Sequence, residues 1–362
     1  MVKSIVTSGW LVFMLGAAVA GARPIGFDYG SINRFFSKVP GWLLIIGSVT
    51  GFIVGTISGE TNVRNAEIAA HVSQAEARYA TGDYDGAIAI YTEAIRLSPD
   101  AESYYGRGLA RYAKGDAQGA IADLSRAIHL NPQDGVAYYY RGLVYRSMCC
   151  LTPSTFLDKA IADFGAAVRL SPQIAIDAYR QRADTYYTSV RFDNAISDYN
   201  EALSLNPQSA DLYRARAGVR RARGDYYGAM ADYNEALRLN PRDALAYVYR
   251  GDTRRAWGDQ DGALADYTRA LRLKPQDANV YGFRGDTRFA KGDYDGAILD
   301  YSAALRFDPK SADALYGRGL AQRARGNLTD AVSDFRQVLQ IRPDHPQYQE
   351  LQSKIVAWSK GK

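Results

Sequence analysis

Residues 211–241 read DLYRARAGVRRARGDYYGAMADYNEALRLNP, and this stretch returns along the chain with small changes. Its landmarks are an aromatic residue near the start, a Gly-Asp pair in the middle, a second aromatic residue among alanines, and a closing proline. The copy that begins 34 residues later keeps Tyr247, Gly258-Asp259, Tyr267 and Pro275. Self-similarity at a fixed period predicts that one structural unit is repeated along the chain.

The closing prolines count the units. They are Pro99, Pro132, Pro172, Pro207, Pro241, Pro275, Pro309 and Pro343, at spacings of 33, 40, 35, 34, 34, 34 and 34 residues. The sequence therefore predicts eight units, of which the third is longer because of an insertion around residues 148–154.

Each unit is predicted to contain two helices. In the second unit, Tyr104, Gly108 and Tyr112 are four residues apart and therefore share one helix face. The Gly-Asp pair ends one helix and starts the next, because glycine favours a helix C-terminus and aspartate a helix N-terminus. The closing proline prevents the second helix from running on.

A 34-residue period with an aromatic residue, Gly or Ala, Ala, an aromatic residue, Ala and Pro in that order resembles the tetratricopeptide repeat family. The resemblance covers about residues 66–345. It implies an all-α fold, a right-handed α-solenoid of eight helix-turn-helix repeats over residues 68–345. Members of this family share the binding of other proteins, so the resemblance implies a binding role and names no partner.

Two charged columns accompany the apolar pattern. An arginine precedes the small residue of the first helix, and an aspartate precedes the aromatic residue of the second helix. The arginines are Arg107, Arg141, Arg182, Arg216, Arg250, Arg284 and Arg318, and the aspartates are Asp123, Asp163, Asp198, Asp232, Asp266, Asp300 and Asp334. The first unit lacks both, with Gln74 and Ile90 in their places. We expect an Arg–Asp pair in each of the other seven units, where it would hold the helix register.

Composition and motifs limit the chemistry. The 362 residues carry a net charge of +5, and their 44 Lys and Arg alternate with 39 Asp and Glu, without a charged tail for nucleic acid. Adjacent Cys149 and Cys150 and three histidines give neither a disulfide framework nor a zinc spacing. The sequence contains no phosphate loop, His-Glu zinc pair or nucleophile elbow. We expect no enzyme activity, metal, cofactor, nucleic acid or small-molecule substrate.

Residues 1–60 are expected to form a membrane region. Residues 5–22 and 40–58 carry no charge and approach the roughly 20 residues that span a bilayer. Residues 5–22 are either a transmembrane helix or a signal peptide that is cleaved at an A-x-A site. Residues 40–58 are expected to be a transmembrane helix, followed by a linker at 61–67. Loop charges slightly favour an integral cell-membrane location with the repeats on the periplasmic or outer side over the cytoplasmic side.

Gly47, Gly51 and Gly55 lie at intervals of four, on one face of the second membrane stretch. Glycines with this spacing let another membrane helix pack closely, although glycine is also frequent in such helices in general. Self-association and packing with a membrane-embedded partner therefore stay open.

The first helices are expected to line an inner groove, as they do in the family that the chain resembles. Tyr and Arg are the residue types that anchor protein interfaces, and Arg also binds carboxylates. The predicted groove residues are Tyr105, Tyr112, Tyr139, Arg146, Arg180, Tyr187, Arg214, Arg221 and Arg255, with acidic Asp252 and Asp286 beyond them. They favour an extended or helical partner segment of acidic character, against the alternative of a solvated surface without a single ligand.

Two segments lie outside the regular pattern. The insertion that holds Cys149 and Cys150 is either a tolerated loop, or a partner contact or redox-sensitive pair. In the segment 346–362, the spacing of Tyr348, Leu351, Ile355 and Trp358 predicts an amphipathic helix over residues 347–359. We expect this helix to cap the last repeat, with partner binding as the alternative.

The sequence thus predicts a non-enzymatic protein-interaction scaffold anchored to a membrane. The alternative is an accessory subunit or assembly factor of a membrane protein complex that packs through the glycine-rich helix.

Overall fold

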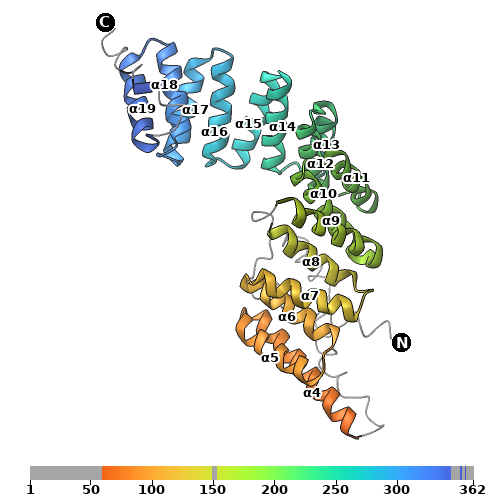
Figure 1. Ribbon diagram of the computed structural model, residues 1–362. Coiled ribbons are helices and arrows are strands. Elements are labelled where there is room, and N and C mark those ends of the chain that lie inside the picture. The colour runs from red at the N-terminus through yellow and green to blue at the C-terminus, as the bar shows by residue number, and fades with distance from the viewer. Residues whose placement is uncertain (1–58, 149–152, 344–350, 353–354, 356–362) are drawn as a thin grey trace. The chain divides into compact units, whose positions relative to one another are not determined.

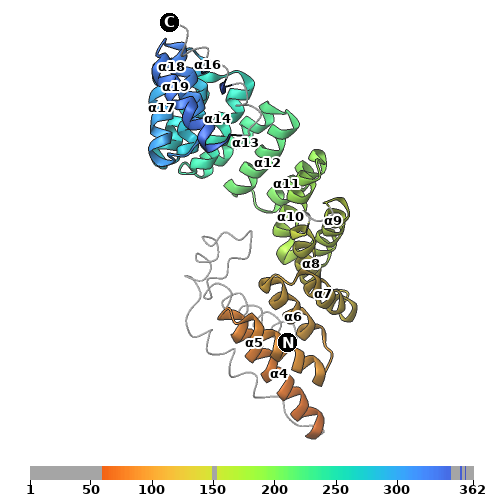
Figure 2. The ribbon, with the colours of Figure 1, turned by 60° about the vertical axis from the view of Figure 1, so that its left-hand side comes forward.

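In a computed structural model, α-helices of similar length follow one another along the chain (Figure 1 and Figure 2). The structure describes residues 59–148, 153–343, 351–352 and 355. These residues contain sixteen α-helices, α4 to α19, one short 3-10 helix, η2 (Pro172–Ile174), and no strand. They belong to two compact units, each made of several repeats, of which the first ends at Ser189 and the second begins at Val190. From here on, "first unit" and "second unit" mean these two parts of the chain, and a single helix pair is called a repeat.

The helices alternate between the first and the second helix of a repeat, as the sequence predicts. The first helices are α4 (Gly59–Ala80), α6 (Ala101–Lys114), α8 (Gly135–Ser147), α10 (Ala175–Thr188), α12 (Ala210–Arg223), α14 (Ala244–Trp257), α16 (Ala278–Ala290) and α18 (Ala312–Ala324). The second helices are α5 (Tyr84–Leu97), α7 (Ala117–Leu130), α9 (Pro153–Leu170), α11 (Phe192–Leu205), α13 (Tyr226–Leu239), α15 (Gln260–Leu273), α17 (Tyr294–Phe307) and α19 (Leu328–Ile341). Seven of these pairs pack as hairpins within a unit, whereas α10 and α11 belong to different units.

The turn inside a hairpin is built from the Gly-Asp pair. In the sixth repeat Gly258 has a φ of +91°, a left-handed conformation that glycine adopts without strain and that ends α14. The Asp259 carboxylate accepts a hydrogen bond from the Gly262 N–H at 2.9 Å and caps α15. Four further turns repeat this geometry: Gly82-Asp83, Gly115-Asp116, Gly224-Asp225 and Gly292-Asp293.

Small residues let the two helices of a hairpin approach closely. A Cβ placed on Gly251 would lie 2.9 Å from Cε1 of Tyr267, and one placed on Gly319 would lie 2.7 Å from Cε1 of Phe335. Both aromatic side chains are fully buried. Because the interior is close-packed, a larger side chain at these glycines would push the helices apart. The column of small residues therefore sets the helix spacing.

Within each unit, the first helices lie on the inner side of the stack. Consecutive first helices touch directly, as α4 does with α6, α6 with α8, and α16 with α18. In the described part of the chain, consecutive second helices do not touch to this extent. The exposed surface of the first helices is called the inner face below.

The expectation of an integral membrane protein is not supported. Among the residues that the structure describes, no helix is both long and apolar enough to cross a bilayer. The longest, α4, has 22 residues but contains Glu67, Glu76 and Arg78. The two stretches behind the expectation, 5–22 and 40–58, lie outside the described residues. The prediction of an integral location in the cell membrane is thus contradicted by the helices that the structure describes.

Three other sequence expectations fall near the ends of the described ranges. Residues 61–67, predicted as a linker, lie within α4. The glycines Gly47, Gly51 and Gly55 and the cysteines Cys149 and Cys150 are outside the described residues.

The last repeat is covered at the two apolar positions that the structure describes beyond it. Leu351 and Ile355 are 4% and 6% exposed and belong to the same core as Val332, Phe335 and Val338. A terminal repeat has no further neighbour, so apolar side chains from beyond it must shield its core. The predicted capping helix stays a prediction, and burial of Leu351 and Ile355 against the last repeat agrees with it.

Candidate functional site

The charged columns form buried ion pairs, here called the Arg–Asp ladder. In the sixth repeat, Nε and Nη2 of Arg250 donate to the two carboxylate oxygens of Asp266 at 2.9 and 2.6 Å. The same double contact joins Arg107–Asp123, Arg141–Asp163, Arg216–Asp232, Arg284–Asp300 and Arg318–Asp334. The prediction is confirmed in these six repeats. The seventh pair, Arg182 with Asp198, would join different units and stays a prediction.

The arginines of these six pairs also reach the preceding repeat, a contact that the sequence pattern does not predict. Nη1 of Arg250 donates to Oδ1 of Asn234 on α13 at 2.7 Å. In each case the acceptor lies two residues after the ladder aspartate of the preceding repeat. In the first repeat, Ile90 stands in place of that aspartate and Thr92 is the acceptor. The other acceptors are Thr92, Ser125, Asn200, Thr268 and Ser302. One guanidinium therefore holds three helices together.

A tyrosine and a second arginine complete the ladder in the sixth repeat. The Arg250 guanidinium lies 5.5 Å from the centre of the Tyr247 ring, one turn earlier on α14. Arg254 forms a second ion pair with Asp266 at 2.8 Å and donates to the Gly262 carbonyl oxygen at 3.1 Å. The buried charges of Arg250, Arg254 and Asp266 therefore have their partners inside the protein. The ladder has a structural role, in holding the helices together.

The predicted groove residues divide into a buried and a partly exposed set. Tyr105 and Tyr139 are 8% and 4% exposed and belong to the cores between hairpins, so they offer little surface to a partner. The residues that keep exposed surface are Tyr112, Arg146, Arg180, Tyr187, Arg214, Arg221 and Arg255. Of these, Tyr187 is 44% exposed and the Arg255 side chain is 40% exposed.

In the first unit, the structure brings the predicted tyrosines and arginines together. Burial raises the pKa of Tyr112, and the nearby charge of Arg146 opposes this shift. Burial and the charge of Asp177 raise the pKa of Tyr139, against the charges of Arg180 and Arg146. Tyr112 also packs against the core that contains Tyr139, so these two tyrosines lie in one cluster, within electrostatic reach of Arg146.

Acidic residues of the following repeat partly neutralise the inner-face arginines. The pairs, measured from a guanidinium nitrogen to a carboxylate oxygen, are Arg146–Asp184 at 3.6 Å, Arg221–Asp252 at 3.9 Å and Arg255–Asp286 at 3.8 Å. The sequence pattern predicted a basic stretch followed by an acidic one, not ion pairs between an arginine of one repeat and an aspartate of the next. The feature of the sequence that could have revealed these pairs is the equal spacing of Arg221 to Asp252 and of Arg255 to Asp286.

A column of exposed ion pairs runs along the repeats, and at one place in the second unit two aromatic residues stand where a pair would be. A Lys or Arg at the end of a first helix pairs with an Asp near the start of the preceding second helix. These pairs are Lys114–Asp85, Arg223–Asp193, Lys291–Asp261 and Arg325–Asp295. The corresponding positions between the fifth and sixth repeats hold Tyr227 and Trp257, which are 79% and 56% exposed.

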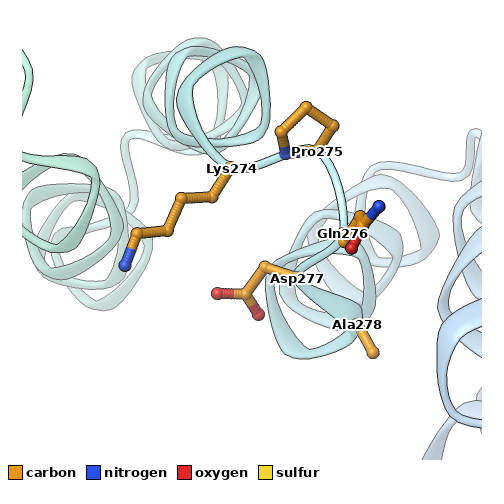
Figure 3. A pocket seen from close by; sticks show the side chains of 5 residues that line it. All are labelled: Lys274, Pro275, Gln276, Asp277 and Ala278. Carbon is orange, nitrogen blue, oxygen red and sulfur yellow. The ribbon is translucent and has the colours of Figure 1, made fainter.

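The pocket in Figure 3 has a volume of about 510 Å³ and is formed by a single turn. Its lining residues are Lys274, Pro275, Gln276, Asp277 and Ala278, between α15 and α16. The Asp277 carboxylate is already used, since it accepts the Val280 N–H and caps α16. Within residues 59–148 and 153–343, no three metal-binding side chains gather as a metal site requires.

Family models match the sequence over most of its helix pairs. Models described as "Tetratricopeptide repeat" match residues 72–146, 176–209 and 312–345, and one described as "TPR repeat" matches residues 217–255 and 285–323. The repeats of this chain are tetratricopeptide repeats. The expected resemblance is thereby confirmed for the repeats.

Several solved structures share the fold, and two of them are described as tetratricopeptide repeat proteins. The C-terminal part of a TPR repeat-containing protein from Cytophaga hutchinsonii is 16% identical with a TM-score of 0.57, over 68% of this chain and 98% of that one. A tetratricopeptide repeat protein from Parabacteroides merdae is 20% identical with a TM-score of 0.53, over 71% and 98%. PilF from Pseudomonas aeruginosa is 20% identical with a TM-score of 0.50, over 62% and 100%. Among curated proteins, no sequence matches.

Proposed function

We propose that this chain is a non-enzymatic protein-interaction module, which binds an extended segment of a partner protein along the inner face of its tetratricopeptide repeats. The observation that carries the proposal is the row of partly exposed arginine and tyrosine side chains on the first helices. These residue types dominate the binding energy of protein interfaces.

The two sets of arginines support this proposal by their different surroundings. The ladder residue Arg250 has a side chain that is 16% exposed and donates to two residues at hydrogen-bond distance. The inner-face residue Arg255 is 40% exposed, and its nearest carboxylate, on Asp286, is 3.8 Å away. That distance is longer than a hydrogen bond. The Arg255 guanidinium can therefore turn to a ligand without breaking a hydrogen bond of the architecture.

The charge balance of the inner face narrows the class of partner. Asp184, Asp252 and Asp286 each lie within ion-pair distance of an inner-face arginine. A run of acidic residues would meet these aspartates as well as the arginines. We therefore favour a polar, extended segment with single acidic residues over a strongly acidic one.

Site-specific photocrosslinking in the source organism tests the proposal. A photoreactive benzoylphenylalanine at position 221 or 255 is expected to crosslink the same partner protein. The matched control is position 238 on α13, where Arg238 is 61% exposed and belongs to a second helix, outside the inner face as defined above. Equal crosslinking at position 238, or none at positions 221 and 255, would contradict the proposal.

A further inference from the structure

The second unit contains a hydrogen bond that repeats across the inner face. In the sixth repeat, the Tyr267 hydroxyl donates to Oδ1 of Asp252 at 2.6 Å. In the seventh, the Tyr301 hydroxyl donates to Oδ1 of Asp286 at 2.7 Å. The tyrosine comes from the second helix and the aspartate from the first helix of the same repeat. At this position of the repeat, the tyrosine hydroxyl therefore donates to a carboxylate wherever the first helix supplies one in these two repeats.

The fifth repeat has the tyrosine but lacks the aspartate. Tyr233 is fully buried, and its hydroxyl oxygen has no hydrogen-bond partner among the described residues. Gly218 stands where the other two repeats have the aspartate. A Cβ placed on Gly218 would lie 4.0 Å from the Tyr233 hydroxyl oxygen and within 4 Å of nothing else. The space that the missing side chain leaves is called the Gly218 gap below.

The gap has an unfavourable effect on the folded chain alone. A buried hydroxyl without an acceptor has given up its hydrogen bonds to water without replacement. A glycine inside a helix also destabilises that helix relative to most other residues. Both effects would be offset if a partner supplied the missing acceptor.

A second donor lies close to the gap. Nε of Arg221 is buried and has no hydrogen-bond partner in the described part of the chain. Burial raises the pKa of Tyr233, and the charge of Arg221 is the largest influence that opposes the rise, so the guanidinium lies near the hydroxyl. The charge of Arg214 also opposes the rise in the pKa of Tyr233. The Arg214 guanidinium, however, already contacts the carboxylates of Asp211 at 2.7 Å and Asp243 at 3.0 Å.

We propose that the Gly218 gap receives the carboxylate of an acidic side chain from the partner segment, which accepts hydrogen bonds from Tyr233 and Arg221. The nearby Asp252 carboxylate provides the template, because it accepts from Tyr267 and lies 3.9 Å from Arg221. The guest carboxylate takes the place that an aspartate at position 218 would take. This inference rests on the proposed function, since it requires a segment on the inner face.

The gap can be reached from the inner face. Gly218 is half-exposed, and the neighbouring Arg221 side chain is 36% exposed. Arginine side chains are long and flexible, so a small movement of Arg221 opens the way to the Tyr233 hydroxyl.

Substitutions within the chain test the chemistry of the gap without a partner. Gly218→Asp is expected to supply the missing acceptor and raise the midpoint of thermal unfolding. Tyr233→Phe alone is expected to raise the midpoint slightly, because it removes a buried hydroxyl that has lost its hydrogen bonds to water without replacement. In the double variant, Tyr233→Phe is expected to cancel the rise in midpoint that Gly218→Asp gives by itself. The matched control Tyr267→Phe is expected to lower the midpoint, since that hydroxyl is bonded to Asp252.

Peptide selection tests the ligand. A phage-displayed library of random dodecapeptides is panned on the full chain, and one enriched peptide is synthesised. We expect its affinity to fall at least about tenfold on Tyr233→Phe, on Gly218→Asp, and when its acidic residue is replaced by the amide. Affinity for Tyr267→Phe is expected to change little, because that hydroxyl is already engaged.

The outcomes separate this site from the proposed function. Enriched peptides that bind Tyr233→Phe as tightly as wild type, or that lack a required acidic residue, would overturn the carboxylate site and leave inner-face binding in place. A library that yields no binding peptide would contradict both proposals.

Discussion

Single buried carboxylates neutralise the ladder arginines, so the loss of one leaves buried charge uncompensated. Asp266 is 3% exposed and accepts from both Arg250 and Arg254. Asp266→Ala leaves two guanidinium groups without a counter-charge in a poorly solvated place. We expect it to lower the free energy of unfolding by about 3–5 kcal/mol. Urea unfolding followed by circular dichroism measures the difference.

Asp261 on the same helix is the matched control. It pairs with Lys291 at the surface, where its side chain is 85% exposed. Exposed pairs contribute little, so Asp261→Ala is expected to cost less than about 1 kcal/mol. If both variants lost the same free energy, burial of the ladder would not be the reason for its contribution.

Glu76 gives the first unit a pH dependence. Burial, and after it the charge of Glu102, raises the pKa of Glu76 from 4.5 to about 7 in the folded protein. The unfolded chain releases this proton near pH 4.5. The stabilising contribution is therefore complete below that pH and is lost as the pH rises to about 7.

We expect the first unit to unfold at a lower temperature as the pH rises through this window. Glu76→Gln cannot ionise and is expected to flatten that part of the dependence. Thermal unfolding of both proteins at a series of pH values measures the effect. A parallel decline in the variant would show that other groups are responsible.

Among the helices, the cap of α19 departs from the pattern. Asn327 stands where the other Gly-Asp turns have aspartate, and in the described structure its side chain makes no capping hydrogen bond. An aspartate would accept an N–H of the first turn and would face the positive end of the helix dipole. We expect Asn327→Asp to raise the free energy of unfolding by about 0.5–1 kcal/mol.

Calorimetry of the variant and wild type checks this cap. The matched control is Asp259→Asn at the start of α15, which is expected to change stability in the opposite direction, since Asp259 holds the Gly262 N–H at 2.9 Å. Melting of Asn327→Asp at or below the wild-type temperature would argue against the expectation.

Across the molecule, stability is expected to pass from repeat to repeat, because each helix packs mainly against those adjacent in sequence. Leu351 and Ile355 cover the core around Phe335. Leu351→Asp together with Ile355→Asp is expected to uncover that core. Hydrogen exchange should then speed up in α18 and α19, while α14 and α15 keep their protection.

Mass spectrometry of exchanged peptides measures this difference along the chain. A milder pair, Leu351→Ala with Ile355→Ala, serves as the control and is expected to speed exchange in the same helices by a smaller factor. A uniform loss of protection in the second unit would contradict nearest-neighbour stability.

The sequence by itself determined the repeat number, the order of the helices, their Gly-Asp turns and the Arg–Asp ladder. These features follow from relations inside one hairpin. Helix periodicity, the capping role of Asp259 and the 16-residue step from Arg250 to Asp266 are the same wherever the hairpin occurs. They could therefore be predicted without knowing how hairpins pack together.

Only the tertiary structure decided which inner-face residues a partner can reach. Tyr105 and Arg214 occupy the same position of their repeats, yet Tyr105 is buried and Arg214 keeps exposed surface. The neutralisation of Arg221 by Asp252 and the unfilled gap at Gly218 were also invisible in the repeat pattern. Exposure and pairing between repeats depend on how each hairpin is placed against the next, and the periodicity of one unit does not specify that placement.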